Sequence, residues 1–449
     1  MTADRAPLTY ADALAAIAAR GRYGVRLGLG RTRALLRELG DPQRAVRGAL
    51  VAGTNGKGSV LALAGAALRA AGYRVGETPK PHLVTYRERL QIDGRPVDPV
   101  TFARLVDEIL PIADRVARRL GQPTEFELLT AIVFRWFAEQ RPDVALVEVG
   151  LGGRLDATHA WNGGVAAVTN VELDHTDRLG STIEAIAREK AAIIERGDVA
   201  VTGARGPALA IIRRRARRLD VPLAEVVPAP LLGLDRDGIE VELAGLGRVR
   251  VGLRGRHQAA NVAVADALLD ALEAAGVATV AAPARRTGYA RATWPGRLEL
   301  FEDDGREILL DGAHNPAGAA SLAVALDDLR PFLAAGRLTL VVAAMGDKDV
   351  DGIVGALRGA ASLAGARIIC TSLDVVRALS AAQLARHWAS VDPAARPETD
   401  EDPRVAFERA RSGPGGPIVV AGSLYLVGAV RAQLVDDPGL RDPEPARAR

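Results

Sequence analysis

The stretch Gly48–Tyr73, GALVAGTNGKGSVLALAGAALRAAGY, decides which class of fold this chain can adopt. An apolar run with strand character leads into a glycine-rich turn, and the turn leads into a long helical pattern. In such a turn the backbone N–H groups can point inward around phosphate oxygens, and the positive end of the helix dipole faces the same anion. The stretch therefore predicts a nucleotide phosphate site at the end of a buried strand.

The glycine-rich turn has the residue types of a P-loop. We assign nucleotide binding to Gly53, Thr54, Asn55, Gly56, Lys57, Gly58 and Ser59. Lys57 is expected to meet the β- and γ-phosphates, and Ser59 can ligate Mg²⁺. The spacing departs from the usual P-loop, because a glycine separates the lysine from the serine and only two residues lie between Thr54 and Lys57.

Strand, loop and helix patterns repeat along the rest of the chain. The apolar runs at 143–149 and 163–171 are each followed by a loop and a helical segment, which predicts a parallel sheet covered by helices. The segment 231–255 instead alternates apolar and polar residues around glycines, as an antiparallel hairpin does. Beyond TWPGRLEL (293–300), four further strand patterns predict a second, smaller open sheet.

These patterns predict an α/β fold with a P-loop NTPase-like parallel-sheet domain, followed by a smaller Rossmann-like open α/β domain. We place the first domain, with its N-terminal helices, at residues 1–292 and the second at 298–435. The tail 436–449 is rich in Asp, Pro and Arg and is predicted to be disordered.

The composition restricts the possible functions. The net charge is only +3, and the densest basic run, IIRRRARRLD (211–220), contains no aromatic residue, so nucleic-acid binding is not expected. No apolar run approaches the roughly 20 residues that cross a bilayer, and the first residues lack a signal pattern. We therefore expect a cytoplasmic protein without membrane contact. The single cysteine, Cys370, excludes a disulfide framework.

Polar residues follow two predicted strands of the first sheet at their carboxyl ends, where open α/β sheets bind ligands. Glu148 ends one strand, and His175 follows the next within the acidic cluster NVELDHTDRLG (170–180). A carboxylate at this edge suits Mg²⁺, and the histidine suits a metal or a phosphate. The alternatives are a turn or capping carboxylate and a structural histidine.

Polar residues also follow three predicted strands of the second sheet. They are Asp311 and His314 in DGAHNP, the motif Asp347-Lys348-Asp349, and Ser423. Because the carboxyl ends of parallel strands meet at one edge, we expect these residues to converge on a crevice that Arg297 in the linker also reaches.

Lysine is rare in this chain, since only four of its 58 basic residues are lysines, at positions 57, 80, 190 and 348. Lys190 lies in the helical pattern STIEAIAREKAAII (181–194), where an exposed lysine would be ordinary. The scarcity of lysine suggests instead that some of the four have a role that arginine cannot fill.

Together these motifs are similar to those of the folylpolyglutamate synthase/dihydrofolate synthase family, a branch of the Mur-type ATP-dependent amide ligases. The resemblance extends from about Gly24 to Val427. It rests on VAGTNGKGSV, PHLVTYRERLQIDGRPV, EVGLGGRLDAT, LDHTDRLGSTIEAIAREKAAII, WPGRLE, LLDGAHNPAG, DKD and GSLYLVG, in this order.

The resemblance implies an ATP-dependent acid–amino-acid ligase. ATP would phosphorylate the carboxylate of dihydropteroate or of the terminal glutamate of a folate, and the amine of L-glutamate would then displace phosphate. The implied cofactors are ATP, Mg²⁺ and a lysine carbamate at Lys190. The implied partners are small molecules, a pterin or folate and L-glutamate, and the implied assembly is a monomer.

The resemblance also implies roles for individual residues. Catalysis is assigned to Lys57, Lys190 and His314. Contacts with the adenosine part of the nucleotide are assigned to Asn261, Arg297 and Asp311. Metal ligation is assigned to Ser59, Glu148, His175 and Lys190, with Ser59 on the first metal and Lys190 on the second, as a carbamate that arginine cannot form. The acid, the γ-phosphate and the incoming glutamate are assigned to Lys80, His82, Arg89, Asp156, His314 and Ser423.

Two positions depart from the family pattern. Lys80 stands where the family has a serine whose hydroxyl helps to ligate a second metal, and a protonated lysine cannot ligate a cation. Either the ammonium takes over part of that metal's charge, or Lys80 turns to solvent and Thr78 or water fills the gap. His159 stands where an asparagine is usual after Leu-Asp-Ala-Thr.

Two rival functions remain open. One is a Mur-type ligase that acts on a different acid, and the other is a P-loop NTPase that uses hydrolysis as a conformational switch. A non-catalytic binding module fits less well, because Lys57, Glu148, His175 and Lys190 are all present. Nucleotide turnover that requires both an acid and an amine separates these classes.

Overall fold

The computed structural model describes residues 6–21, 24, 26–375, 377–437 and 440. The predicted disordered tail, 436–449, lies largely outside the described residues.

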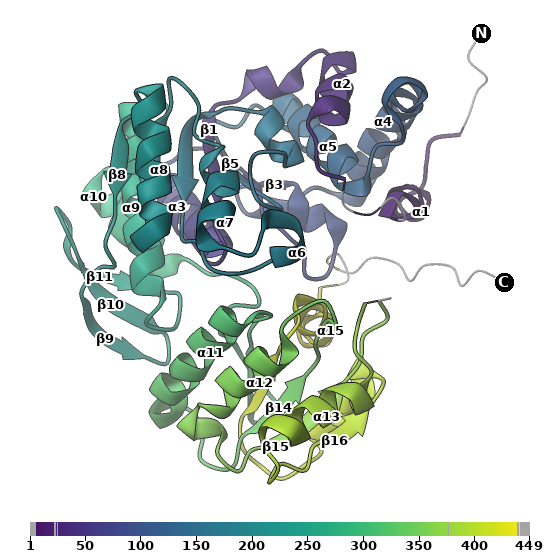
Figure 1. Cartoon of the computed structure of the whole chain (residues 1–449), viewed down its shortest axis with the longest axis vertical. Coiled ribbons are helices and arrows are strands. Elements are labelled where there is room, and N and C mark those ends of the chain that lie inside the picture. Colours follow the sequence, from purple (N-terminus) through teal and green to yellow (C-terminus); the bar gives the residue numbers. More distant parts are fainter. Residues whose placement is uncertain (1–5, 22–23, 25, 376, 438–439, 441–449) are drawn as a thin grey trace. The chain divides into compact units, whose positions relative to one another are not determined.

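The chain groups into two compact units, whose helices and strands are named in Figure 1. Unit 1 contains the described residues up to Pro228 together with Ala260–Tyr289. Unit 2 contains Ala229–Ala259 and the described residues from Ala290 onward. The domain limits 1–292 and 298–435 stay predictions.

Unit 1 is built on an eight-stranded sheet with the order β4-β3-β2-β5-β1-β6-β7-β8. Its strands are β1 (Gly48–Ala52), β2 (Val75–Thr78), β3 (Gln91–Ile92), β4 (Arg95–Pro96), β5 (Val144–Glu148), β6 (Gly164–Val168), β7 (Val199–Thr202) and β8 (Leu223–Glu225). All pairs are parallel except those of the short edge strands β3 and β4. The predicted parallel sheet is confirmed, and the carboxyl ends of β5, β1 and β6 meet at one edge.

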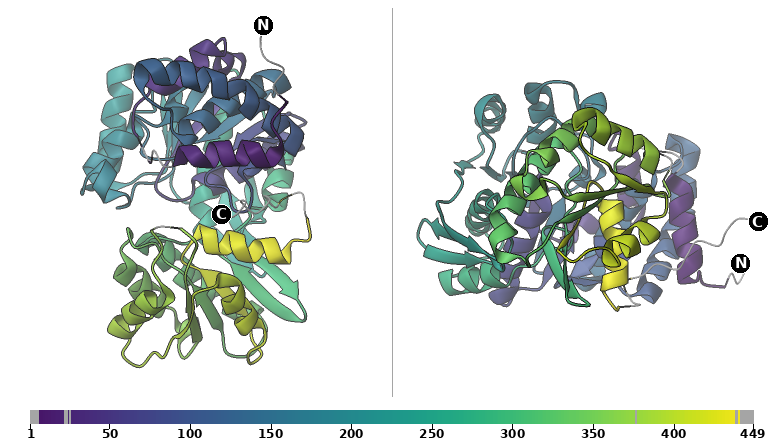
Figure 2. Two further views of the ribbon diagram at one scale, coloured as in Figure 1. Left: turned by 90° about the vertical axis from the view of Figure 1, so that its right-hand side faces the viewer. Right: turned by 90° about the horizontal axis from the view of Figure 1, so that it is seen from below.

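Helices and short 3₁₀ turns surround this sheet. The helices are α1 (Tyr10–Gly21), α2 (Gly30–Glu38), α3 (Lys57–Ala70), α4 (Pro99–Leu120), α5 (Glu125–Gln140), α6 (Thr176–Leu179), α7 (Ile183–Ala191), α8 (Gly206–Leu219), α9 (Gln258–Ala274) and α10 (Ala282–Arg291). The 3₁₀ turns are η1 (Pro42–Ala45), η2 (Tyr86–Arg89) and η3 (Ala157–Ala160). Helices α1, α2, α4 and α5 pack against one another, as the purple and blue ribbons of Figures 1 and 2 show.

The two central strands have no exposed face. Every residue of β1 and of β5 is buried. Strands covered by helices on both sides carry continuous apolar runs, which explains why the sequence of these strands does not alternate. Among the helices of the described part, none has the length and hydropathy needed to cross a lipid bilayer.

The loop between β5 and β6 is held by its own side chains. Asp156 Oδ2 accepts the N–H of Leu151 at 2.8 Å, and its Oδ1 accepts the hydroxyl of Thr158 at 2.6 Å. The buried ring of His159 places Nε2 at 3.4 Å from Glu195 Oε1, just beyond α7. His159, which stands where an asparagine is usual, therefore anchors this loop to the segment that follows α7.

Unit 2 contains two sheets. The segment predicted as an antiparallel hairpin forms a three-stranded antiparallel sheet from β9 (Leu231–Asp235), β10 (Gly238–Leu243) and β11 (Gly247–Val251). The second sheet has six strands in the order β12-β13-β17-β14-β15-β16. They are β12 (Glu299–Asp303), β13 (Arg306–Leu310), β14 (Thr339–Val342), β15 (Arg367–Thr371), β16 (Glu398–Asp400) and β17 (Ile418–Ala421). Only the edge pair β12–β13 is antiparallel.

The helices of unit 2 complete an open α/β layer arrangement. They are α11 (Pro316–Leu329), α12 (Val350–Arg358), α13 (Ala381–Val391), α14 (Pro403–Arg411) and α15 (Leu424–Leu434), with the 3₁₀ turns η4 (Arg330–Phe332) and η5 (Ala361–Leu363). Helices α11 and α12 lie side by side (Figure 1). The predicted α/β class, with two parallel-sheet parts, is confirmed.

Helix α10 approaches the P-loop helix α3 at backbone distance. A Cβ placed on Gly288 of α10 would lie 2.3 Å from Cα of Ala67 in α3. No side chain can swing away to relieve this contact, because the opposing atoms are backbone. The position of α3 therefore depends on a glycine at 288.

We expect Gly288→Ala to lower the free energy of unfolding by about 1–3 kcal/mol, because the added methyl must push two helices apart. Urea unfolding followed by circular dichroism measures the change. Gly355→Ala is the matched control: Gly355 is an exposed glycine within α12, and a Cβ there meets nothing within 4 Å. It should raise stability by about 0.5–1 kcal/mol. Equal stability of Gly288→Ala and wild type would contradict the close approach.

The pair formed by His159 and Glu195 should make stability depend on pH. Burial alone lowers the pKa of His159, but the contact with Glu195 outweighs it and leaves the pKa raised. The same contact lowers the pKa of Glu195 to about 2. Both groups are charged at mildly acidic pH, so the pair stabilises the fold there. That stabilisation is lost as the pH rises through the pKa of His159 in the folded state.

We therefore expect wild type to exceed His159→Asn in stability by up to about 1 kcal/mol near pH 5, a small value because the Glu195 side chain is 41% exposed. The difference should be smaller at pH 9, where the histidine is neutral. Thermal unfolding at both pH values measures it. A difference that grows toward alkaline pH would disprove the ion pair.

Candidate functional site

The P-loop lies between β1 and α3, as the sequence predicts, and two of its glycines are sterically required. Gly53 has φ +155°, and a Cβ there would lie 1.9 Å from Oγ1 of Thr169. Gly56 has φ +79°, and a Cβ there would lie 2.3 Å from Oδ1 of Asn261. Asn261, assigned to the adenosine part, therefore lies directly beside the loop within unit 1.

The segment after β6 fixes the other side of the P-loop. The N–H of Asn55 donates to Asn170 Oδ1 at 2.8 Å, and the hydroxyl of Thr169 donates to the Asn55 carbonyl at 2.6 Å. The N–H of Glu172 donates to the hydroxyl of Thr54 at 3.0 Å. These bonds shape the turn through a neighbouring strand, so the loop conformation belongs to the sheet.

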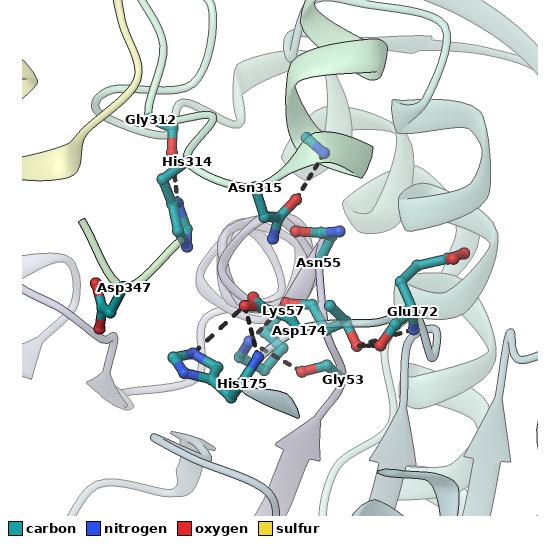
Figure 3. Close-up of polar contacts among 12 residues, drawn as sticks. Gly53, Asn55, Lys57, Glu172, Asp174, His175, Gly312, His314, Asn315 and Asp347 are labelled. Atoms are coloured by element: carbon teal, nitrogen blue, oxygen red, sulfur yellow. Dashed lines mark hydrogen bonds and ion pairs between the residues drawn. The ribbon is translucent and has the colours of Figure 1, made fainter. Parts of the chain in front are cut away.

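Lys57 opens α3 and folds back over its own loop. Its Nζ donates to the carbonyl oxygens of Gly53 at 3.0 Å and Thr54 at 3.1 Å (Figure 3). The same Nζ lies 3.9 Å from Oε1 of Glu148, whose side chain is buried at the end of β5. Ser59 is also buried, one turn into the start of α3. The residues predicted for phosphate and magnesium thus come from adjacent strands at one edge.

Lys190 reaches the same loop from α7. It is only 5% exposed, and its Nζ donates to the Gly53 carbonyl oxygen at 2.8 Å. Two lysines, Lys57 and Lys190, therefore share one acceptor. Burial, reinforced by the Lys57 charge, lowers the pKa of Lys190 to about 7. A sizeable fraction of its amine is consequently neutral near pH 7.

Lys80 lies in the loop after β2 and turns inward. Its Nζ donates to the main-chain oxygen of Glu148 at 2.7 Å, and its own N–H donates to Oε2 of that residue at 2.9 Å. The ammonium also lies 4.8 Å from the centroid of the Phe126 ring. Burial lowers the pKa of Lys80 to about 8, although the charges of Asp156 and Glu148 oppose this effect. The alternative in which Lys80 points to solvent does not match this geometry.

Three of the four lysines of the chain thus meet around Glu148 and Gly53. The fourth, Lys348, lies in unit 2 after β14. Each of the three donates a hydrogen bond from its ammonium to a backbone oxygen at this sheet edge, so the scarce lysines gather at one site.

His82 and Arg89 form a second group near Lys80. The Arg89 Nε donates to His82 Nδ1 at 2.9 Å, and the rings of His82 and Tyr86 lie 4.3 Å apart. Burial and the Arg89 charge hold the pKa of His82 well below its usual value, so this ring is neutral. The predicted substrate residues Lys80, His82, Arg89 and Asp156 all belong to unit 1.

Sequence reasoning missed the aromatic and acidic residues of this group. Phe126 faces the Lys80 ammonium, and Tyr86 lies between His82 and Arg89. Glu125 neighbours Tyr86 and Arg89, and burial raises its pKa. The available signal was the capping box of α5, whose Thr124 and Glu127 mark the helix start and thus the turn in which Phe126 lies.

His175 is more exposed than Lys190, and it contacts Asp174, whose charge acts on Lys190. Its side chain is 42% exposed, its N–H donates to Asp174 Oδ1 at 2.8 Å, and its Nε2 lies 3.9 Å from Asp174 Oδ2 (Figure 3). Within the described part of the chain no three His, Cys, Asp or Glu side chains are grouped as a metal cage. A site with few protein ligands suits Mg²⁺, because this ion keeps several bound waters and is also held by phosphate oxygens.

The residues predicted in the second sheet follow its strands as expected. Asp311 follows β13, and its Oδ2 accepts the N–H of Leu298 at 3.0 Å. His314 Nδ1 lies 2.8 Å from the Gly312 carbonyl oxygen (Figure 3). Ser423 follows β17, which pairs in parallel with β13, and it caps α15.

Arg297 lies in the linker at the start of unit 2. Its Nη1 donates to the main-chain oxygen of the preceding residue, Gly296, at 2.9 Å. Two of the three residues assigned to the adenosine part, Arg297 and Asp311, thus lie in unit 2, and Asn261 lies in unit 1.

Comparison with known proteins gives two family matches. Residues 51–269 match the Mur ligase middle domain, and residues 296–424 match the Mur ligase, glutamate ligase domain. A dihydrofolate synthase/folylpolyglutamate synthase of Bacillus subtilis is 33% identical over 437 residues, which cover 95% of this chain and 99% of that protein.

Solved structures agree with these matches. Mycobacterium tuberculosis folylpolyglutamate synthase, in complex with ADP and AMPPCP, has a TM-score of 0.84 and 34% identity, covering 95% of this chain and 100% of that one. A bifunctional folylpolyglutamate synthase/dihydrofolate synthase with Mn, AMPPNP and L-glutamate bound has a TM-score of 0.78 and 30% identity, covering 96% and 98%. This chain belongs to the dihydrofolate synthase/folylpolyglutamate synthase family of Mur ligases.

Proposed function

We propose that this protein joins L-glutamate to the carboxylate of a pteroate or folate in an ATP-dependent reaction that releases ADP and phosphate. The observation that carries this function is the meeting of Lys57 and Lys80 at Glu148, at the carboxyl edge of the sheet. Two anions, a triphosphate and a carboxylate, must approach each other before they react. A buried group of cations supplies the attraction that this approach needs.

In the first step a carboxylate oxygen of the acid attacks the γ-phosphorus of ATP. The bond from that phosphorus to the β–γ bridging oxygen breaks, so the products are an acyl phosphate and ADP. Lys57 and the start of α3 stabilise charge on the phosphoryl oxygens, and Lys80 faces the acid. The step converts a poor electrophile into one with a good leaving group.

In the second step the neutral amine of L-glutamate attacks the acyl carbon. The carbon–oxygen bond to phosphate breaks, the nitrogen loses a proton, and an amide remains. We assign His314 and Ser423 to the γ-phosphate and the incoming glutamate, as the family resemblance implies, and both residues follow neighbouring parallel strands of unit 2. Holding the nucleophile in place converts an encounter between two molecules into a local event.

A divalent cation fits the donors at the P-loop. The buried Ser59 and Glu148 would hold Mg²⁺ together with phosphate oxygens, and His175 would approach from the next strand end. When bound, the cation neutralises phosphoryl charge during transfer. Asn261, Arg297 and Asp311 are assigned to the adenosine part of ATP.

Lys190 is proposed to carry a carbamate, in which its amine has combined with CO₂ and released a proton. The burial that lowers its pKa to about 7 supports this reaction, since only a neutral amine attacks CO₂. The change would replace a positive charge 2.8 Å from the Gly53 oxygen with a negative one and create an oxygen ligand for a cation.

Two further expectations belong to this proposal, a cytoplasmic location and a monomeric state. The rival functions differ in what they require. A ligase for another acid would show no turnover with folates, and a P-loop NTPase switch would hydrolyse ATP without an acid or an amine.

We expect phosphate release from Mg·ATP only when L-glutamate and an acid are both present. Dihydropteroate and tetrahydrofolate are tested separately, and mass spectrometry detects the gain of one glutamyl unit. Lys57→Met is the matched inactive variant, with kcat lowered by about 10²-fold or more because it loses a charge on the phosphates. ATP hydrolysis at the same rate with and without the acid and L-glutamate would contradict a ligase function and favour the P-loop NTPase switch.

We expect a carbamate carbon signal in ¹³C NMR spectra of wild type supplied with ¹³C-bicarbonate, and no such signal in Lys190→Arg. Removal of CO₂ should lower the activity of wild type by about 10-fold or more, and bicarbonate should restore it. The arginine variant keeps the positive charge and should not respond. A wild-type spectrum without the signal, together with activity that is indifferent to CO₂, would disprove the modification.

A further inference from the structure

Lys80 is a cation of the site that is hydrogen-bonded directly to the end of β5. Its ammonium and its main-chain N–H both donate to Glu148, at 2.7 and 2.9 Å, so the residue is attached to the end of β5 at two points. Phe126 closes a third side, with its ring centroid 4.8 Å from Nζ. Such a clamp fixes where the positive charge lies.

The same clamp determines what else the site can hold. A lysine ammonium carries three donors and no lone pair, so it can bind anionic oxygens but cannot ligate a metal. The bond to the Glu148 oxygen uses one donor and leaves two for ligand oxygens. A divalent cation placed next to this ammonium would be repelled, and it would find no ligand in the Lys80 side chain.

The hydroxyl nearest in sequence takes no part in the contacts of Lys80. Thr78 lies at the end of β2, is 1% exposed, and its Oγ1 has no hydrogen-bond partner among the described residues. Water, the other candidate to fill the gap, would have to displace an ammonium that is already hydrogen-bonded to Glu148. The acid-binding side of the site therefore already contains a fixed monovalent cation.

We propose that the Lys80 ammonium takes the place of a second divalent cation, so that this chain binds one divalent cation per bound nucleotide. The inference rests on the proposed function, because it gives Lys80 the task of holding the acid's carboxylate oxygen beside the γ-phosphoryl group. The single divalent cation then belongs to the phosphate side, with Ser59 and Glu148, and the carbamate proposed for Lys190 would be a ligand of that cation.

Counting bound Mn²⁺ tests this inference without relying on turnover. Free Mn²⁺ is measured by electron paramagnetic resonance during titration of protein saturated with AMPPNP. We expect one Mn²⁺ per wild-type chain and two per chain of Lys80→Ser, because the variant removes a charge and adds a hydroxyl ligand. Lys80→Met keeps an apolar contact with Phe126 but removes the charge and the hydrogen bond to the Glu148 oxygen without adding a hydroxyl, so it should bind one Mn²⁺ and lower kcat by about 10²-fold.

Two controls separate charge from folding. Arg95→Ser removes one positive charge from the exposed hairpin strand β4 and should leave the Mn²⁺ count at one. Melting temperatures identify variants that fail to fold. If Lys80→Ser does not fold, Lys80→Thr is a second variant that carries a hydroxyl. Lys80→Arg should bind one Mn²⁺, because it keeps the charge.

The outcomes distinguish this inference from the proposed function. Two Mn²⁺ ions in wild type, or one in both wild type and the hydroxyl variants, overturns the role of Lys80 even if the protein ligates glutamate to folates. One ion in wild type and two in Lys80→Ser supports the role even if folates are not the acid. Equal kcat of Lys80→Met and wild type would also overturn it.

Discussion

One backbone oxygen, the carbonyl of Gly53, accepts hydrogen bonds from two ammonium groups, and the site is organised around it. Lys57 belongs to the same loop, whereas Lys190 arrives from α7, 137 residues further along the chain. Burial lowers the pKa of Lys190 to about 7, and the charge of Lys57 on the same acceptor adds to this effect. The shared acceptor thus links the P-loop to α7 and brings the charge of Lys57 close to the amine of Lys190.

This arrangement is possible because β1 lies between two parallel partners. Val51 pairs with Glu148 of β5, and Ala52 pairs with Val168 of β6. The register brings the P-loop, a buried carboxylate and the segment after β6 to the same edge. Parallel strands always end on the same side, so this convergence follows from the order of the strands in the sheet.

Much of the fold and of the candidate site could be predicted from the sequence. A clear apolar run in the sequence predicts where a strand ends. Such runs lie next to the P-loop, Glu148 and the polar residues after β13 and β17. The orientation of Lys80 was not readable, because a loop lysine looks the same whether it faces solvent or Glu148. Phe126 was missed for a similar reason: its helix start is visible in the sequence, but the ammonium that it faces lies in another loop.

The fold class, the position of the phosphate loop and the strand ends that carry chemistry could be predicted from sequence, because these features depend on residues close together in the chain. Which residues touch became known from the three-dimensional structure. It placed three scarce lysines around Gly53 and Glu148, turned Lys80 inward, and joined His159 to Glu195. Contacts between distant segments depend on which strands become neighbours and on how the loops pack, and a local pattern of residues does not show either.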